Sequence, residues 1–414
     1  MLLKNALIWY REQILRGHIL VNEETGLIER ISLSKTIGTG SDNLEINLKG
    51  KLVIPSMVDI HSHLRDFEES HKETYETGAL AAAAGGFTTV FDMPNKLNPI
   101  NSPESLTKAV ERAKRIQWAK IIPYVLLNRD TESSLISNYP YLKAYRGITT
   151  GNYLTSISEI KEFLIRSSGI LVVHCEDNAR ISENLKKFQK TLENHWKIRD
   201  SQTELLAIKN LLESTKDIAT RAKLHIAHVT LIESIKILHS RSVSFEVTPH
   251  HLFLNNDDFS QLGVKGKMNP PLRSKVEQHY LLEAFLKGQI RIISTDHAPH
   301  TIHEKKDLEL SGVPGLETCL PLLFNFCNPI DKRKLALIIN ALAQNPRSLM
   351  NLSEKGIIAV NEPANLTVID LKKRKVVRGD DLKTKCKWSP WEGIELQGWP
   401  VLTIREGKIT YNDL

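Results

Sequence analysis

Residues 53–63 read VIPSMVDIHSH, a β-rich apolar run that ends in two histidines, His61 and His63. Seven more β-rich runs follow along the chain, at residues 88–93, 121–127, 141–146, 169–175, 224–229, 244–249 and 290–295. Helical segments fall between them, for example at residues 73–85, 103–115, 201–213 and 275–288. Eight β runs that alternate with helices predict an α/β fold, a closed (β/α)8 barrel of the TIM type. A doubly wound open sheet is the alternative, but no glycine-rich dinucleotide turn supports it.

The two ends of the chain have a different pattern from the middle. Residues 1 to about 55 and residues from about 356 onward contain short strands and turns, such as GIIAVNEPANLTVIDL and VLTIREGKITYN. We therefore expect residues 1–55 and 356–414 to build one small β sandwich together. The hydrolase-type barrel would then comprise residues 56–355.

Composition excludes several classes of protein. Hydrophobic residues make up 41% of the 414 residues and charged residues 25%, as in ordinary globular proteins. No apolar run approaches the ~20 residues that span a bilayer, and the first residues lack a signal-peptide pattern, so we expect a cytoplasmic protein without membrane contact. The four cysteines, Cys175, Cys319, Cys327 and Cys386, are too sparse for a disulfide framework and are expected to be reduced.

The net charge of +7 could favour anionic partners or be a solvated surface. No zinc finger, aromatic-basic RNA motif or phosphate loop accompanies this charge. We expect no nucleic-acid partner.

Metal-binding residue types follow four of the predicted strands. His61 and His63 are two residues apart, so that both point to one face of the strand end. His174, His228 and Asp296 lie at the ends of three later runs. Because functional residues of parallel barrels gather at the carboxyl ends of the strands, these five side chains are expected to converge on one pocket.

Imidazole and carboxylate ligands suit zinc, and five of them exceed one tetrahedral ion. Two zinc ions are therefore plausible, and they would need an anionic bridge. Lys143, at the end of the fourth run, is the candidate, since a neutral lysine amine can react with carbon dioxide to form a carbamate. Taken singly, each of these residues is more often an ordinary surface or core residue, and only their combination at strand ends favours a metal site.

The chain resembles the cyclic amidohydrolases and, among them, the dihydroorotases. The resemblance runs over nearly the whole chain and rests on VHCED, KAYRGITTGN, EVTPHHLFL, KMNPPLRS, STDHAPH and SGVPGLET, which follow in family order. It implies that His61, His63 and Asp296 hold the more buried metal and that His174 and His228 hold the second. Carboxylated Lys143 would bridge the two zinc ions. In a competing alignment, Thr149 or Thr150 falls at the position where some bacterial relatives have a bridging aspartate, which would leave no bridge.

The same resemblance implies a set of substrate-binding residues. Arg65 matches the dihydroorotase pattern HxHxR and Asn95 matches its MPN motif, whereas allantoinase-like enzymes typically lack this arginine. An arginine fork suits a substrate carboxylate, and Asn269 and His300 match further substrate contacts. The family usually has Pro-Gly after the arginine motif, where this chain has Phe67 and Glu68, which indicates a reshaped loop.

The resemblance implies the reversible cyclisation of N-carbamoyl-L-aspartate to (S)-dihydroorotate in de novo pyrimidine biosynthesis, with a zinc-activated hydroxide and Asp296 as the proton shuttle. The alternatives are a hydantoinase-like or allantoinase-like enzyme and an inactive scaffold relative. The expected partner is the small-molecule substrate, and a homodimer or an association with aspartate carbamoyltransferase is the assembly to test. Residues 301–313, which are polar and follow Asp296, are either a mobile substrate lid or an ordinary barrel loop.

Overall fold

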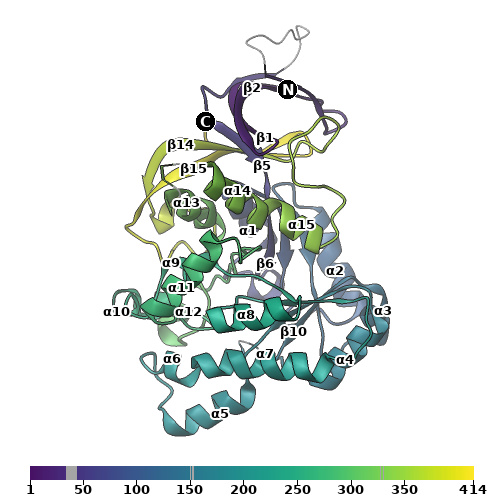
Figure 1. Cartoon of the computed structure of the whole chain (residues 1–414), viewed down its shortest axis with the longest axis vertical. Coiled ribbons are helices and arrows are strands. Elements are labelled where there is room, and N and C mark those ends of the chain that lie inside the picture. Colours follow the sequence, from purple (N-terminus) through teal and green to yellow (C-terminus); the bar gives the residue numbers. More distant parts are fainter. Residues whose placement is uncertain (34–43, 150, 152, 327, 330) are drawn as a thin grey trace.

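The computed structural model describes residues 1–33, 44–149, 151, 153–326, 328–329 and 331–414. Figure 1 shows the strands of the two chain ends gathered above a larger body in which helices surround the barrel strands. The strands are β1 (Leu2–Tyr10), β2 (Gln13–Val21), β3 (Ile28–Ser32), β4 (Glu45–Asn47), β5 (Leu52–Pro55), β6 (Met57–Ser62), β7 (Phe87–Asp92), β8 (Lys120–Pro123), β9 (Val125–Leu126), β10 (Tyr141–Tyr145), β11 (Ile170–His174), β12 (Lys223–Ile226), β13 (Ser244–Phe245), β14 (Leu366–Val376), β15 (Glu395–Arg405) and β16 (Lys408–Asn412).

The α-helices are α1 (Tyr75–Ala84), α2 (Pro103–Lys114), α3 (Ser133–Asn138), α4 (Ile157–Arg166), α5 (Asn178–Lys187), α6 (His195–Ile198), α7 (Ser201–Thr215), α8 (Ile232–Ser240), α9 (Pro249–Phe253), α10 (Phe259–Leu262), α11 (Lys275–Leu286), α12 (Ile302–Asp307), α13 (Leu316–Phe326), α14 (Lys332–Ile339) and α15 (Asn345–Leu349). Short 3-10 turns are η1 (Phe67–Glu69), η2 (Gly263–Gly266) and η4 (Gly379–Asp381), and η3 (Asn340–Gln344) is a π turn.

The predicted barrel is confirmed. Strands β6, β7 and β8 pair in parallel, and so do β9 to β13 in sequence order. Only Tyr124 separates β8 from β9, so the two are parts of one barrel strand. The eighth run closes the ring, because Ile293 pairs with Val247 and His297 pairs with Ser62, both in parallel.

A buried carboxylate reinforces this closure. Asp59 on β6 accepts hydrogen bonds from the backbone N–H of Thr295 at 2.9 Å and from its hydroxyl at 2.6 Å. The chain positions that it joins are 236 residues apart. The first and last barrel strands are thereby held in a fixed register directly beside His61 and Asp296.

Helices begin where the sequence provides capping residues. Ser102, Ser274 and Thr74 each cap a helix with a capping box, and α2 also has a proline in its first turn. Helix α1 is buried on nearly all sides and consists largely of alanine, because it lies against the terminal strands as well as the barrel. The hydroxyl of Thr403 on β15 donates to the carbonyl of Ala83 at 2.7 Å.

Strands from both chain ends meet as predicted, in one continuous eight-stranded sheet with the order β16-β15-β14-β5-β1-β2-β3 and β4 beside β1. Strand β5 links the two ends, since it pairs in parallel with β1 and antiparallel with β14. Buried residues of these strands form a core of their own, with Leu3, Ile8, Ile19, Leu366 and Leu402 among its members. Strand β5 ends at Pro55 and β6 begins at Met57. The division into domains at residues 55/56 and 355/356 stays a prediction.

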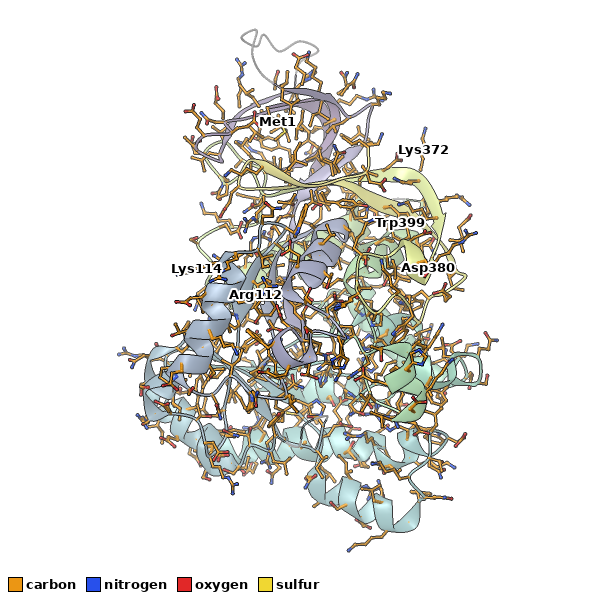
Figure 2. All side chains as sticks on the ribbon, turned by 180° about the vertical axis from the view of Figure 1, so that it is seen from behind. Met1, Arg112, Lys114, Lys372, Asp380 and Trp399 are labelled. Atoms are coloured by element: carbon orange, nitrogen blue, oxygen red, sulfur yellow. The ribbon has the colours of Figure 1, made fainter. Side chains whose placement is uncertain are left out.

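The carboxyl-terminal segment also packs against the barrel. Trp388, Trp391 and Trp399 form a buried cluster with Met268 and Val313 from barrel loops. Figure 2 labels Trp399 on β15, a strand of the terminal sheet. Within the described ranges, no helix is long and apolar enough to cross a membrane.

Candidate metal and substrate site

A pocket of about 50 Å³ opens at the carboxyl ends of the barrel strands. It is lined by His61, His63, Arg65, Asn95, Tyr145, Thr149, His174, His228, Asn269, Asp296, Ala298, Ser311 and Gly312. The ends of several barrel strands and the loops that follow them therefore deliver polar side chains to one small space. This is where parallel barrels place their chemistry.

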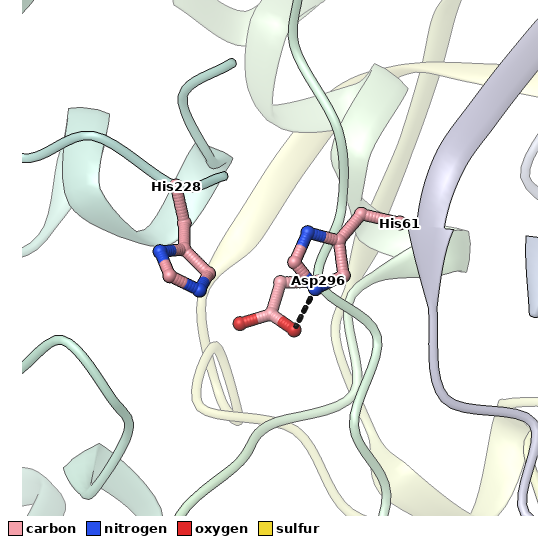
Figure 3. A group of neighbouring side chains, drawn as sticks. All are labelled: His61, His228 and Asp296. Atoms are coloured by element: carbon pink, nitrogen blue, oxygen red, sulfur yellow. Dashed lines mark ion pairs between the residues drawn. The ribbon is translucent and has the colours of Figure 1, made fainter. Parts of the chain in front are cut away.

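The core of the pocket is a cluster of His61, His228 and Asp296, drawn in Figure 3. One candidate ligand atom from each of them lies within 4.8 Å of the others. Asp296 Oδ1 is 3.3 Å from His61 Nε2 and 3.2 Å from His63 Nε2. His228 and Asp296 have φ angles of 36° and 45°, a conformation that is costly for non-glycine residues and is retained mostly at functional sites.

A buried carboxylate behind His61 sets the orientation of its ring. His61 Nδ1 donates to Glu246 Oε1 at 2.5 Å. The other ring nitrogen, Nε2, therefore carries the lone pair, and this lone pair faces the pocket. Burial lowers the pKa of His61 to about 4, so the imidazole is neutral at neutral pH. Burial alone would raise the pKa of Glu246, but His61 and His225 outweigh it and hold that pKa well below its ordinary value.

A second buried carboxylate holds His174. His174 Nε2 donates to Glu176 Oε2 at 3.0 Å, and its Nδ1 lies 2.9 Å from His228 Nε2. Arg199 forms an ion pair with Glu176. Burial opposes ionisation of Glu176, yet Arg199 and His174 bring its pKa down to about 2. The Glu176 carboxylate therefore stays charged and directs the Nδ1 lone pair of His174 toward His228.

Two nitrogen atoms beside this cluster have no hydrogen-bond partner among the described residues: Lys143 Nζ and His228 Nδ1. Lys143 is fully buried on β10, with its Nζ 5.3 Å from the centre of the Tyr145 ring. Burial lowers the pKa of Lys143 to about 8. A buried polar atom without a partner is costly, and its presence here points to a group that completes the site.

The substrate side of the pocket is built around Arg65. Its Nε donates to the carbonyl of Pro299 at 3.2 Å, and its Nη2 lies 3.2 Å from His300 Nε2. No carboxylate within the described ranges forms an ion pair with this guanidinium, although the side chain is buried. The residues after it, Asp66 and Phe67, have positive φ angles, and Phe67 begins η1.

The predicted residues do not all occupy equivalent places. His61, His63, His174, His228 and Asp296 line the pocket, as do Arg65, Asn95 and Asn269. Lys143 and His300 are not among its lining residues. His300 lies behind Arg65, with its Nε2 3.1 Å from the carbonyl of Ser311. The roles of all these residues stay predictions.

Asn95 has a contact that the sequence did not suggest. His63 Nδ1 donates to Asn95 Oδ1 at 2.7 Å, so Asn95 orients His63 and has its amide N–H groups left for other partners. Of the two threonines in the competing alignment, Thr149 lines the pocket with an unpartnered hydroxyl, and Thr150 lies outside the described residues.

Sequence reasoning missed Glu246 and Tyr145. Glu246 is the single charged residue in the run SFEVTP, and a carboxylate inside an apolar strand is a recognisable signal because it must find a buried partner. Tyr145 follows Lys143 by two positions on β10 and so shares its face of the strand. Its hydroxyl is buried beside the pocket without a described partner.

The loop of residues 301–313 contains helix α12 and contributes Ser311 and Gly312 to the pocket. Lys305 is buried and donates to the carbonyls of Lys267, Leu310 and Gly312 at 2.8, 2.8 and 3.0 Å. These bonds fasten the loop to the barrel in this conformation.

Cys175, Cys319 and Cys386 carry free, buried thiols. The fourth cysteine, Cys327, lies outside the described residues.

Comparison with known proteins agrees with the geometry. The profile of the amidohydrolase family matches residues 52–410. The dihydroorotase of Pyrococcus furiosus is 33% identical over 97% of this chain and 93% of its own, and that of Geobacillus thermodenitrificans is 32% identical over 99% and 98%. The chain therefore belongs to the amidohydrolase family, a family of hydrolases, and within it to the dihydroorotases.

Solved structures show the same fold. The L-hydantoinase (dihydropyrimidinase) of Arthrobacter aurescens superposes with a TM-score of 0.92 over 100% of this chain and 96% of that chain, at 23% identity. The D-hydantoinase (dihydropyrimidinase) of a Thermus species gives a TM-score of 0.87 at 21% identity, over 100% and 95%. At these identities the likeness establishes the fold alone.

Proposed function

We propose that the chain is a dihydroorotase that interconverts N-carbamoyl-L-aspartate and (S)-dihydroorotate. The observation that carries the proposal is the buried guanidinium of Arg65, which has no salt bridge among the described residues, in the same pocket as the cluster of His61, His228 and Asp296. A candidate hydrolytic site with a guanidinium in its wall fits a cyclic amide that bears a carboxylate. The dihydroorotases among the relatives support this choice of substrate.

Two zinc ions are part of the proposal, and the residues present fit them. His61, His63 and Asp296 would hold one ion, His174 and His228 the other, with carboxylated Lys143 between them. The neutral imidazoles, the clustered ligand atoms and the unpartnered Lys143 Nζ all support a metal centre. When bound, zinc supplies a Lewis acid that polarises a carbonyl group and makes water more acidic.

Carboxylation of Lys143 requires a neutral amine. With a pKa of about 8 in place of 10.5, the neutral fraction of Lys143 at pH 7 rises from about 0.03% to about 10%. The amine then attacks carbon dioxide and loses one proton, which yields the carbamate anion. Burial thus favours the neutral amine that this reaction needs. Within the described part of the chain, Lys143 Nζ also has no hydrogen bond that the reaction would have to break.

Arg65 is the residue that binds the substrate carboxylate. A guanidinium that forms two parallel hydrogen bonds fixes both the position and the orientation of a carboxylate. The Nδ2 group of Asn95 and the unpartnered Oδ1 of Asn269 add a donor and an acceptor for the ring amides. His300 acts behind Arg65, since its nearest described partners are Arg65 and the Ser311 carbonyl.

Asp296 moves the proton. Burial raises the pKa of its carboxyl above the ordinary value, which makes the carboxylate a better proton acceptor than an exposed aspartate. In the hydrolytic direction, Asp296 takes a proton from the attacking water and gives it to the ring nitrogen that leaves. In the cyclising direction, it takes the proton from the carbamoyl nitrogen as that nitrogen attacks the side-chain carboxyl carbon, and it delivers the proton to the departing oxygen.

Two alternatives remain distinguishable by experiment. A hydantoinase-like enzyme has the same fold, but Arg65 would then face a substrate without a carboxylate. An inactive scaffold would be expected to have lost ligand residues, whereas His61, His63, His174, His228 and Asp296 are all present.

The test is the R65Q variant, compared with R129Q as a matched control, because Arg129 is exposed and outside the pocket. R65Q should lower kcat/KM for dihydroorotate about 10²-fold or more, as the loss of a charge-assisted pair implies, while R129Q stays near the parent value. Unchanged kcat/KM in R65Q would refute the role of Arg65 in substrate recognition.

A further inference from the structure

A second and much larger cavity lies at the opposite end of the barrel. Its volume is about 820 Å³, and its walls include the first residues of β12 and β13, the start of the eighth run at Arg291, and the ends of α7 and α8. The lining residues are Leu164, Leu212, Thr215, Lys216, Thr220, Ala222, Lys223, Leu224, His239, Arg241, Ser242, Val243, Ser244, Phe245, Arg291, Ile292, Asn345, Ser348 and Leu349. None of them belongs to the pocket at the carboxyl ends of the strands.

The charge of this cavity is one-sided. Four lysine and arginine side chains line it, and no aspartate or glutamate does. Lys216 has an ion pair with Glu213 on its own helix. Lys223 Nζ donates to the carbonyl of Leu349 at 3.3 Å and to Asn351 Oδ1 at 3.0 Å, which are neutral acceptors.

One acidic residue lies near the arginines of the cavity, since Lys216 and, to a smaller extent, Arg241 lower the pKa of the Glu213 carboxyl. Neither Arg241 nor Arg291 forms an ion pair with any residue in the described ranges, and both are exposed. They start from different elements, Arg241 at the end of α8 and Arg291 at the start of the eighth run. Two guanidinium groups without salt bridges in the wall of one concavity suit a compact, multiply charged anion.

The remaining walls are apolar. Leu164, Leu212, Leu224, Phe245 and Leu349 contribute hydrocarbon surface next to the cationic residues. Pockets of roughly 300–1,000 Å³ with apolar walls and a few placed polar groups are typical of small-molecule sites. A purely inorganic anion would leave these walls in contact with water.

We propose that this cavity binds a phosphorylated small molecule that has an apolar, flat body. Its phosphate groups contact Arg241 and Arg291, with Lys223 and Lys216 completing the cationic side, and its body packs against Phe245 and the leucines. A terminal phosphate group carries close to two negative charges at neutral pH, which suits walls with four cationic and no acidic side chains. The site does not depend on the proposed reaction, because it shares no residue with the catalytic pocket.

The test is calorimetric titration of the purified protein with ATP and with inorganic tripolyphosphate. Both should bind, and ATP should bind more tightly because it adds a flat, partly apolar body. The double variant R241Q/R291Q should weaken both affinities about tenfold or more. The control R115Q/R129Q removes the same charge from exposed sites that do not line the cavity and should bind like the parent.

R65Q serves as a second control, since it removes the guanidinium that lines the pocket at the carboxyl ends of the strands. Affinities that fall in R65Q but not in R241Q/R291Q would assign the binding to the catalytic pocket and overturn the proposal. Absence of binding by both probes, or equal losses in R115Q/R129Q, would also overturn it. Equal affinities of the parent for ATP and tripolyphosphate would refute the proposal that the ligand has an apolar body.

Discussion

Neutralising Glu246 should weaken metal binding without removing any proposed metal ligand. Glu246 accepts from His61 Nδ1 at 2.5 Å and from Ser294 Oγ at 2.6 Å, and its Oε2 lies 3.2 Å from His225 Nε2. In E246Q the side chain keeps its shape but loses the charge that holds the proton on Nδ1. Loss of such an outer partner typically costs about 10–100-fold in metal affinity, which is about 1.4–2.7 kcal/mol.

The assay is competition for zinc between the protein and a chromogenic chelator, followed by activity at saturating zinc. We expect E246Q to need about 10–100 times more free zinc for half-maximal loading and to recover most of its activity when loaded. The control is E204Q. Glu204 is an equally buried carboxylate that accepts from Thr230 and lies 3.8 Å from Arg273, but it contacts none of the proposed ligands.

E204Q should lower the melting temperature and leave zinc affinity within about threefold of the parent. Parent-like zinc affinity in E246Q would refute the argument that this carboxylate orients His61. Equal losses of zinc affinity in E246Q and E204Q would show that the effect is a general loss of barrel stability.

Three further predictions concern Asp296, Lys143 and Glu317. D296N should lower kcat at least about 10³-fold and retain much of its metal, which kinetics and metal analysis of the same sample will check; activity near the parent level would exclude the proton shuttle. K143Q should bind fewer zinc ions than the parent, and the parent itself should lose activity after preparation without carbon dioxide and regain it with bicarbonate; indifference to both would argue against the carbamate. Burial raises the pKa of Glu317 to about 7, although hydrogen bonds from the N–H groups of Lys383 and Thr384 act to lower that pKa. Because the folded pKa exceeds the unfolded value of 4.5, this contribution to stability is fully present below pH 4.5 and is lost as pH rises to 7, a difference of about 3 kcal/mol. The melting temperature of E317Q relative to the parent should therefore increase between pH 5 and pH 8, and a constant difference would contradict the shift.

The barrel could be predicted from the sequence because its signal is local. Each strand is a short apolar run, and each run is followed by the residue that its strand end presents, such as His174 after ILVV. The two-residue spacing of His61 and His63 is likewise a local consequence of strand geometry. All eight predicted runs contribute strands or bridges to the barrel.

Contacts between distant positions could not be predicted in this way. Glu246 and His61 are 185 residues apart, and nothing in SFEVTP indicates which histidine its carboxylate will meet. The continuous terminal sheet depends on the pairing of β5 with both β1 and β14, and strand patterns do not specify partners that are far apart in the chain. The cationic cavity could not be predicted from the sequence for the same reason, since Arg241 and Arg291 belong to separate elements.

The same distinction applies within the candidate site. Motif spacing identified the ligand-type residues, but it gave no sign that Asn95 orients His63 or that His300 stands behind Arg65. These arrangements depend on side-chain rotamers and on loops from opposite sides of the barrel. These contacts can be recognised only in the folded structure, where the ends of the barrel strands lie side by side.

The most direct test of the proposed function is turnover by the purified, zinc-loaded protein of dihydroorotate and N-carbamoyl-L-aspartate, with hydantoin and allantoin alongside. We expect interconversion of the first pair and little activity on the other two compounds, since only the first pair offers Arg65 a carboxylate. Activity confined to hydantoin or allantoin would contradict the proposed specificity, and inactivity on all four with zinc bound would favour the scaffold alternative.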